Sequence, residues 1–483
     1  MVEAWWEYWP YLFAALSAAI GIPTAVHAAM TKEDPRAAIA WVGVILLSPF
    51  LGALLYLVAG INRIRRTSIG NKRFRAESRQ HRNAVQAKDI DGASLVPPEP
   101  RFQSLRRLGN GVSPFPLTPG NLVEPLPGGD AAYPAMLKAI AKARRHVVLS
   151  SYIFDNDPVG ILFADALIEA HRRGVEVRVL IDAVGTRYSR PPIVGRLQEG
   201  GVRVELFLGG LLGFRLPYAN LRNHRKIMVV DGETGFTGGM NIRAGFHSEY
   251  AAGEVGRDMH FRVRGPVVEQ LLAVFLDDWV FASSEELEGP AWQILDSPAP
   301  GGTAARCVVS GPDTYLAATH TMIMGAVAVA RHRIAICSPY FLPDQQLIGA
   351  IGVAARRGVE VDIVIPSANN LRLVDFAMTA QLDQVISAGC RVWRSRGTFD
   401  HAKLMTVDGN WAYVGSSNLD PRSLRLNFEL DMELFDTNLV SRLDAHLRGR
   451  IEDAWQETQD TLKARPFFKR LRNRMVWLAS PYL

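Results

Sequence analysis

The sequence predicts an α/β protein in which two pseudo-symmetric α/β domains share one active site and follow an N-terminal hairpin of two transmembrane helices. Three observations support this fold class. Two long apolar stretches open the chain, a strand–helix–strand pattern occurs twice, and the same polar motif follows each copy of that pattern. A chain of 483 residues is also too long for one ordinary core, so two or three domains are expected.

The two apolar stretches lie at about residues 9–30 and 37–61. Roughly 20 helical residues cross a hydrocarbon core of about 30 Å, so each stretch is long enough to span a bilayer. The alternative is a buried helical hairpin in a soluble protein. We expect residues 1–61 to form a transmembrane hairpin.

Basic residues predict the orientation of that hairpin. The segment from Asn62 to Arg82 holds eight basic residues and one acidic residue, a charge of +7, so the rest of the chain is close to neutral against a formal net charge of +6. Because basic residues flank spans on the cytoplasmic side, both ends of the hairpin and all later domains are expected in the cytoplasm. The same segment is suited to attract anionic lipid headgroups. Residues 62–125, rich in Pro and Gly, are expected to form a basic juxtamembrane segment and linker.

An internal repeat defines the rest of the chain. The sequence RRGVEV occurs at Arg172–Val177 and again at Arg356–Val361, each time between a helical pattern and a buried strand pattern. Strand–helix–strand order predicts a βαβ crossover and a largely parallel sheet. We therefore expect one α/β domain at residues 126–300 and a second at residues 301–483.

The repeat extends into a polar motif, H-x-K-x4-D-x6-G-x-x-N. A single H-x-K is common on exposed strands, but two copies that agree at five positions inside a repeat are a strong indication of function. The ten motif residues are His224, Lys226, Asp231, Gly238 and Asn241 in the first copy, and His401, Lys403, Asp408, Gly415 and Asn418 in the second.

These residue types in this spacing suit phosphodiester transfer. Residues i and i+2 of a strand face the same way, so the histidine and lysine of each copy are expected to point into one cleft. The two lysines and the two asparagines would hold the phosphate oxygens. One histidine would attack phosphorus, and the other would act as acid and base.

Carboxylates complete the predicted site. The attacking imidazole needs an acceptor for its second nitrogen, and the candidates are Asp258 after the first motif and Glu429 after the second. The alternative is that both are ordinary surface acids on strands. We count Asp231 and Asp408 with the catalytic motifs and interpret them as orienting or structural residues. No Cys/His cluster or carboxylate-rich loop indicates a metal, and Cys307, Cys337 and Cys390 are expected to be buried thiols.

At these motifs the chain resembles the phospholipase D superfamily, whose signature is this duplicated motif. Further segments resemble one branch, the bacterial cardiolipin synthases. They are the apolar run IAWVGVILLSPFLGALLYLV, the segment SPYFLPD at Ser338–Asp344, and GSSNLDPRSLRLNFE at Gly415–Glu429. One departure is visible, because Gly239 stands where the signature often has the serine that Ser416 provides in the second copy.

The resemblance implies a phosphatidyl-histidine intermediate and no required metal or other cofactor. It also implies condensation of two phosphatidylglycerols into cardiolipin and glycerol, at the inner membrane of a bacterium. In that family the first motif usually supplies the nucleophile, which would be His224, with His401 as acid and base. The sequence itself does not distinguish the two histidines.

Other functions remain open from the sequence. A hydrolytic phospholipase D or a transferase that uses another alcohol would share the same intermediate. A nuclease is a weaker alternative, because outside the basic segment the chain is close to neutral and nucleic-acid binding favours a broad basic face. A non-catalytic membrane scaffold would be expected to have lost a motif histidine or lysine, and none is lost.

The C-terminal segment Arg465–Leu483 mixes aromatic and aliphatic residues with basic ones. It fits a basic amphipathic helix lying in the membrane interface, and it fits an ordinary packed terminal helix equally well.

Overall fold

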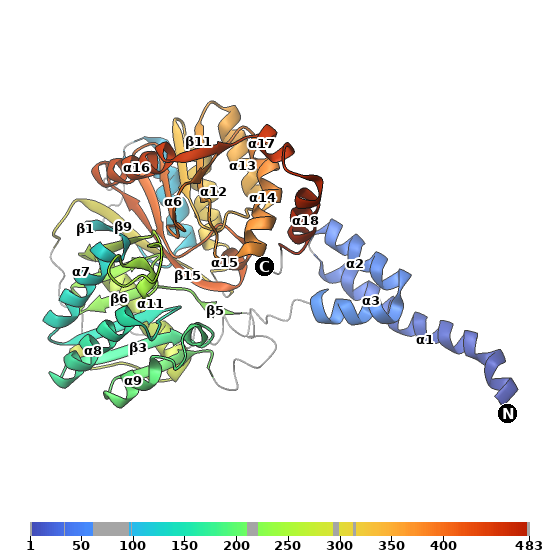
Figure 1. The fold of residues 1–483 in the computed structure, drawn as a ribbon, viewed down its shortest axis with the longest axis horizontal. Helices are drawn as coiled ribbons and strands as arrows, with labels where there is room; N and C mark the ends of the chain where they lie inside the picture. Colours follow the sequence, from blue (N-terminus) through green and yellow to red (C-terminus); the bar gives the residue numbers. More distant parts are fainter. Residues whose placement is uncertain are drawn as a thin grey trace. The chain divides into compact units, whose positions relative to one another are not determined.

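The computed structural model describes residues 2–32, 34–60, 96–97, 99–209, 221–292, 299–312 and 315–480. The chain divides into two compact units, Met1–Arg65 and Arg66–Leu483, which are described separately (Figure 1). The basic segment at residues 62–82 lies outside the described residues, so its expected place beside the membrane stays a prediction.

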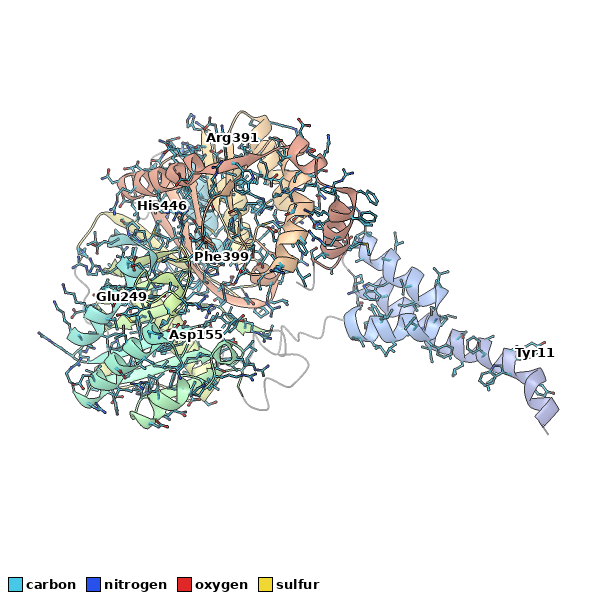
Figure 2. All side chains as sticks on the ribbon, viewed as in Figure 1. Tyr11, Asp155, Glu249, Arg391, Phe399 and His446 are labelled. Carbon is cyan, nitrogen blue, oxygen red and sulfur yellow. The ribbon has the colours of Figure 1, made fainter. Side chains whose placement is uncertain are left out.

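In the N-terminal unit, helix α1 (Val2–Thr31) agrees with the first predicted span. Its part from Tyr8 to Thr31 is 24 residues long, and by length and composition it can cross a membrane. Apolar side chains project from it, as Tyr11 does in Figure 2, where it is 76% exposed.

The second predicted span is not a single helix, so the expected two-helix hairpin is wrong at this point. Residues 37–61 are divided among helix α2 (Pro35–Leu47), helix α3 (Pro49–Leu55) and the π-helical turn η1 (Tyr56–Gly60). The break falls at Ser48, whose φ of −144° and ψ of 79° are not helical, and Pro49 then starts the next helix. Helix α2 is about 20 Å long, too short to cross a core of about 30 Å.

Helix α3 returns alongside α1. At its start, the rings of Phe50 and Phe13 lie 5.3 Å apart. At the end of η1, the Lys32 ammonium group donates a hydrogen bond to the carbonyl of Gly60. The chain therefore leaves η1 at the same end of the unit where α1 finishes.

The second unit is built on one sheet with an internal repeat. From the middle outward, the first half has strand order β1-β8-β7-β6-β2-β3-β4, and the second has β9-β15-β14-β13-β10-β11-β12-β16. The first-half strands are β1 (Thr118–Pro127), β2 (His146–Ser151), β3 (Glu176–Asp182), β4 (Arg203–Phe207), β6 (Ile227–Val230), β7 (Thr234–Gly238) and β8 (Met259–Arg264). The second-half strands are β9 (Thr303–Ser310), β10 (Arg333–Cys337), β11 (Glu360–Pro366), β12 (Arg391–Ser395), β13 (Leu404–Val407), β14 (Trp411–Gly415), β15 (Asn427–Phe435) and β16 (Ala454–Glu457). The predicted duplication is confirmed.

Helices cover the sheet in both halves (Figure 1). In the first half they are α7 (Gly128–Lys142), α8 (Pro158–Arg172), α9 (Val194–Glu199) and α11 (Val267–Ser283). The longer helices of the second half are α12 (Ala318–Val329), α13 (Gln345–Arg356), α14 (Arg372–Ser387), α16 (Thr437–Glu452) and α18 (Phe467–Leu478), with the short helices α15 (Pro421–Arg425) and α17 (Gln459–Lys463).

The sheet is mixed, which corrects the expectation of a largely parallel one. The predicted crossovers are present, because α8 joins the parallel strands β2 and β3 and α13 joins β10 and β11. The motif strands, however, form the antiparallel hairpins β6–β7 and β13–β14. Their tight turns contain Asp231 and Gly232, with φ of 55° and 71°, and Asp408 and Gly409, with φ of 51° and 69°. Such left-handed backbone in a short connection produces a hairpin.

The two halves are not separated at residues 300 and 301. Strands β1 and β9 pair with each other, so the sheet is continuous across the predicted boundary. The described part of the predicted linker contains regular secondary structure. Helix α6 (Pro100–Val112) buries Phe102 and Leu105 in the core of the second half, and β1 begins at Thr118. Residues 100–125 therefore join the two halves instead of preceding them.

Candidate active site

The two H-x-K segments lie where the halves meet, in extended chain directly before strands β6 and β13. Each is hydrogen-bonded to the other half. The His224 N–H donates to the Phe428 carbonyl at 2.9 Å, and the His401 N–H donates to the Arg257 carbonyl at 2.7 Å. Strand β5 (Arg222–Asn223), just before the first motif, also pairs with β15. The backbone therefore brings both motifs to one place.

Each histidine uses a carboxylate from the opposite half. His224 Nδ1 lies 2.8 Å from a Glu429 oxygen, and His401 Nδ1 lies 2.9 Å from an Asp258 oxygen. Asp258 and Glu429 occupy equivalent places in the two halves, beside β8 and in β15. A carboxylate acceptor places the proton on Nδ1 and leaves the Nε2 lone pair available for chemistry.

Burial keeps both imidazoles neutral. His224 and His401 are 8% and 6% exposed. Burial, and then the ammonium groups of Lys226 and Lys403, hold the pKa of His224 well below its usual 6.5. Burial and the same two cations lower the pKa of His401 in the same way. A neutral imidazole is the form that can attack phosphorus.

The lysines stand beside the histidines on the same segments. The Lys226 ammonium group donates to the His224 carbonyl at 2.6 Å, and Lys403 donates to the His401 carbonyl. Burial lowers the pKa of Lys403 to about 8 and lowers the pKa of Lys226 as well. Both can still donate hydrogen bonds to an anion placed between the histidines.

The two carboxylates are held differently. Glu429 accepts hydrogen bonds from the Ser416 hydroxyl at 2.5 Å and from the Asn427 amide at 3.0 Å. Asp258 accepts from the Met259 N–H at 2.7 Å, and burial raises its pKa to about 6. Gly239 replaces the serine because a Cβ there would lie 2.4 Å from an Asp258 oxygen. The departure from the signature is thus explained by steric exclusion of a side chain at position 239.

A cavity of about 940 Å³ opens onto the histidines and takes its lining from both halves. The predicted support residues Asn241 and Asn418 line it. The Asn241 side chain accepts the Ile153 N–H at 3.2 Å, and the Asn418 amide donates to the Ser423 hydroxyl at 3.3 Å.

Sequence reasoning missed the aromatic and arginine lining of this cavity. The Tyr152 ring lies 5.3 Å from that of His224, and the Phe399 ring lies 5.6 Å from that of His401. Phe399 is labelled in Figure 2. The other missed residues are Tyr188, Phe246, Tyr340, Arg222, Arg243 and Arg422. The sequence feature that could have identified these residues is their position. Tyr152 and Tyr340 follow predicted strands, and Arg222 and Arg422 flank the motifs.

Asp231 and Asp408 are not in the site, which corrects their inclusion among the catalytic residues. Asp231 accepts the N–H groups of Arg144, Arg145 and His146, where β2 begins. Asp408 does the same for Arg331, His332 and Arg333 at the start of β10. Each aspartate follows the end of its motif strand, and the histidine and lysine precede the start of that strand. Their role is to fix the strand and its turn.

Within the ranges described above, no group of three or more His, Cys, Asp or Glu side chains is placed to hold a metal ion. Cys307, Cys337 and Cys390 are buried and form no disulfide.

Comparison with known proteins identifies the family of the chain. Residues 136–279 and 323–451 match the family described as "Cardiolipin synthase, PLD-like domain", and residues 19–60 match "Phospholipase_D-nuclease N-terminal". A cardiolipin synthase of Alkalihalophilus pseudofirmus is 32% identical over 94% of this chain and 90% of its own length. Cardiolipin synthase A of Pseudomonas aeruginosa is 32% identical over 96% and 94%. The crystal structure of a phosphatidylserine synthase from Haemophilus influenzae covers 80% of this chain with a TM-score of 0.62 at 15% identity, which supports the fold.

Proposed function

Since the chain belongs to the cardiolipin synthase family with phospholipase D-like domains and is a phosphatidyltransferase, we propose that it joins two phosphatidylglycerols into cardiolipin and glycerol. The observation that carries the proposal is the pair of histidines in one cavity, each backed by a carboxylate of the other half. Such a pair fits two successive in-line displacements at one phosphorus atom, with a histidine on each side of it.

In the first step, His224 Nε2 attacks the phosphorus of one phosphatidylglycerol. The P–N bond forms while the bond from phosphorus to the glycerol headgroup oxygen breaks, and His401 gives its Nε2 proton to the leaving oxygen. An anionic diester between the rings would raise the pKa of His401 and favour its protonated form, against the lowering by burial and by the two lysines. Lys226, Lys403, Asn241 and Asn418 are proposed to hold the non-bridging oxygens.

In the second step, His401 takes a proton from the headgroup hydroxyl of a second phosphatidylglycerol. That oxygen attacks phosphorus, the bond to His224 breaks, and cardiolipin leaves. Protons and electrons balance over the two steps, so neither a metal nor another cofactor enters the scheme.

The nucleophile is assigned to His224 for two reasons. Its partner Glu429 is held by the Ser416 hydroxyl and the Asn427 amide, so the carboxylate can support positive charge on the imidazole during attack. The first motif is also the one that supplies the nucleophile in the family. His401, whose partner Asp258 lacks a hydroxyl donor on Gly239, is assigned the acid and base role.

We also propose that the catalytic unit faces the cytoplasm at a bacterial inner membrane, because eight basic residues follow residue 61. The folded-back α2–α3 pair revises the rest of the topology. With α1 as the crossing helix, and η1 ending beside Lys32, the N-terminus lies on the opposite side from the catalytic unit.

The test is to incubate purified protein with phosphatidylglycerol vesicles and a chelator, and to follow lipids and glycerol by mass spectrometry. We expect cardiolipin and glycerol in equal amounts, and neither product with His224→Ala or His401→Ala. Phosphatidic acid alone would make the protein a hydrolase. Turnover only after another alcohol is added would keep the two-step scheme and change the acceptor.

A further inference from the structure

Helix α18 presents two different faces. One face packs on α14, where the Arg472 guanidinium lies 3.6 Å from the centre of the Phe376 ring and Asn473 is only 5% exposed. The opposite face is an apolar stripe that nothing covers within the described part of the catalytic unit. Its members are Phe467, Phe468, Leu471, Met475 and Leu478, with Phe468 exposed by 79%.

The stripe is continuous along the helix. At 3.6 residues per turn, these five positions fall within about 100° of one another around the axis. Arg470 and Arg474 border the stripe on one side. An apolar stripe bordered by arginines on an exposed helix is typical of segments that lie in the headgroup region of a bilayer.

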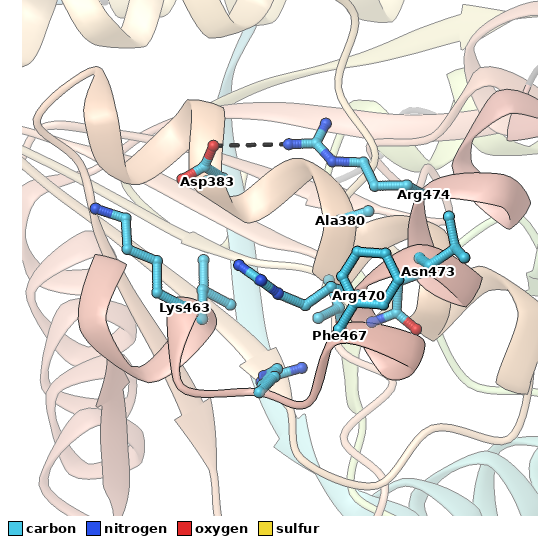
Figure 3. A pocket seen from close by; sticks show the side chains of 11 residues that line it. Ala380, Asp383, Lys463, Phe467, Arg470, Asn473 and Arg474 are labelled. Carbon is cyan, nitrogen blue, oxygen red and sulfur yellow. Dashed lines mark ion pairs between the residues drawn. The ribbon is translucent and has the colours of Figure 1, made fainter.

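A basic pocket adjoins the stripe. It has a volume of about 400 Å³ and lies between α14, α17 and α18 (Figure 3). Four cations and one carboxylate line it, together with the apolar Leu462, Phe467 and Leu471; the charged residues are Lys463, Arg465, Arg470, Arg474 and Asp383.

Two of the four cations are already paired. Arg465 lies 2.5 Å from Glu457, and Arg474 lies 3.7 Å from Asp383, the contact that Figure 3 marks with a dashed line. Lys463 and Arg470 have no carboxylate partner among the residues that the structure describes. The pocket therefore offers uncompensated positive charge directly beside an apolar surface.

We propose that α18 and this pocket form a second lipid-binding site, which docks the catalytic unit on an anionic bilayer. The phosphate of an anionic phospholipid binds between Lys463 and Arg470, and the acyl chains lie against the stripe around Phe468. The site shares no residue with the histidine cavity, so the inference goes beyond the proposed reaction and does not depend on it.

The experiment uses the full chain with His224→Ala, so that no lipid is converted during the measurement. The native cysteines are buried, so an introduced Phe468→Cys can be labelled alone with a fluorophore. The labelled protein is reconstituted in phosphatidylcholine vesicles with or without phosphatidylglycerol, and quenching by nitroxide-labelled lipid is recorded. Val353→Cys on α13, 58% exposed, is the matched control, and Met475→Cys is a second reporter.

Strong lipid quenching at positions 468 and 475 but not at 353, and only with phosphatidylglycerol, is the expected result. The double variant Lys463→Gln with Arg470→Gln should lower the affinity of this site for the anionic bilayer about fivefold per charge removed. Arg196→Gln on the distant helix α9 should leave that affinity unchanged. Equal quenching at 468 and 353, or equal quenching in both vesicle types, would overturn the proposal. A label shielded from both lipid and aqueous quenchers would overturn it too, because the stripe would then be covered by protein.

Discussion

Asp231 and Asp408 belong to the motif but lie outside the cavity that contains the two histidines. Both have a positive φ in a tight turn, and both accept three backbone N–H groups where the neighbouring strand begins. The spacing of the motif follows from this geometry as much as from chemistry. The histidine and lysine need the strand direction that the aspartate fixes at the other end.

Replacing Asp231 with alanine should therefore reduce stability and leave the chemical step largely intact. Loss of a charged acceptor for the Arg144, Arg145 and His146 N–H groups should cost about 1.5–3 kcal/mol of unfolding free energy. Thermal unfolding and turnover per folded molecule measure the two effects. An unchanged midpoint with activity as low as that of His224→Ala would show that Asp231 is catalytic.

Gly239 leads to a prediction at His401, the histidine with the proposed acid–base role. Gly239→Ser should displace Asp258 from His401, because the new Cβ would lie 2.4 Å from the carboxylate oxygen. Turnover should fall about 10- to 100-fold, the loss typical of removing a partner that orients a functional histidine, while the fold is retained. Gly195→Ala on α9, where an added Cβ meets nothing within 4 Å and which does not line the histidine cavity, is the control. Full activity of Gly239→Ser would mean that Asp258 need not hold His401.

At the scale of elements, hydropathy located the apolar N-terminal residues but did not predict how the chain folds through them. The run at 37–61 is apolar throughout, so composition alone predicted one span. The reversal depends on Ser48 and Pro49, and on Tyr56, whose hydroxyl lies 2.9 Å from His27 Nδ1. Such contacts between distant residues are invisible to a sliding window.

The folded-back pair gives a topology that can be measured. A cysteine at the N-terminus and one at the exposed Glu249 should be labelled from opposite sides of sealed membrane vesicles by an impermeant maleimide. The buried native cysteines provide the background. Labelling of both sites from the same side would restore the original hairpin of two complete spans.

The internal repeat predicted the fold of the catalytic unit better than the periodicity of apolar residues did. The two RRGVEV segments identified the duplicated halves, and the crossovers through α8 and α13 follow from them. Helix α6 was missed because its Pro- and Gly-containing sequence reads as a linker, and its burial depends on a groove of the second half. The site histidines and lysines were found because the motif occurs twice.

At the scale of the whole molecule, the two halves form one enzyme because each half supplies the carboxylate that contacts the histidine of the other half. The sequence identified Asp258 and Glu429 as the candidate carboxylates, but it did not show which histidine each of them contacts. The answer depends on the pairing of β5 with β15 and of β1 with β9, which brings the first motif to the second half's strand. Neither half contains a complete site.

The most direct test of this arrangement, in which each histidine contacts a carboxylate of the opposite half, is to trap the covalent intermediate. A phosphodiester with a p-nitrophenolate leaving group needs no acid in the first step, so adduct formation reports the nucleophile alone. Peptide mass spectrometry should find the adduct on His224, retained in Asp258→Asn and lost in Glu429→Gln. An adduct on His224 that is lost in Asp258→Asn and retained in Glu429→Gln would contradict the claim that each histidine depends on a carboxylate of the opposite half.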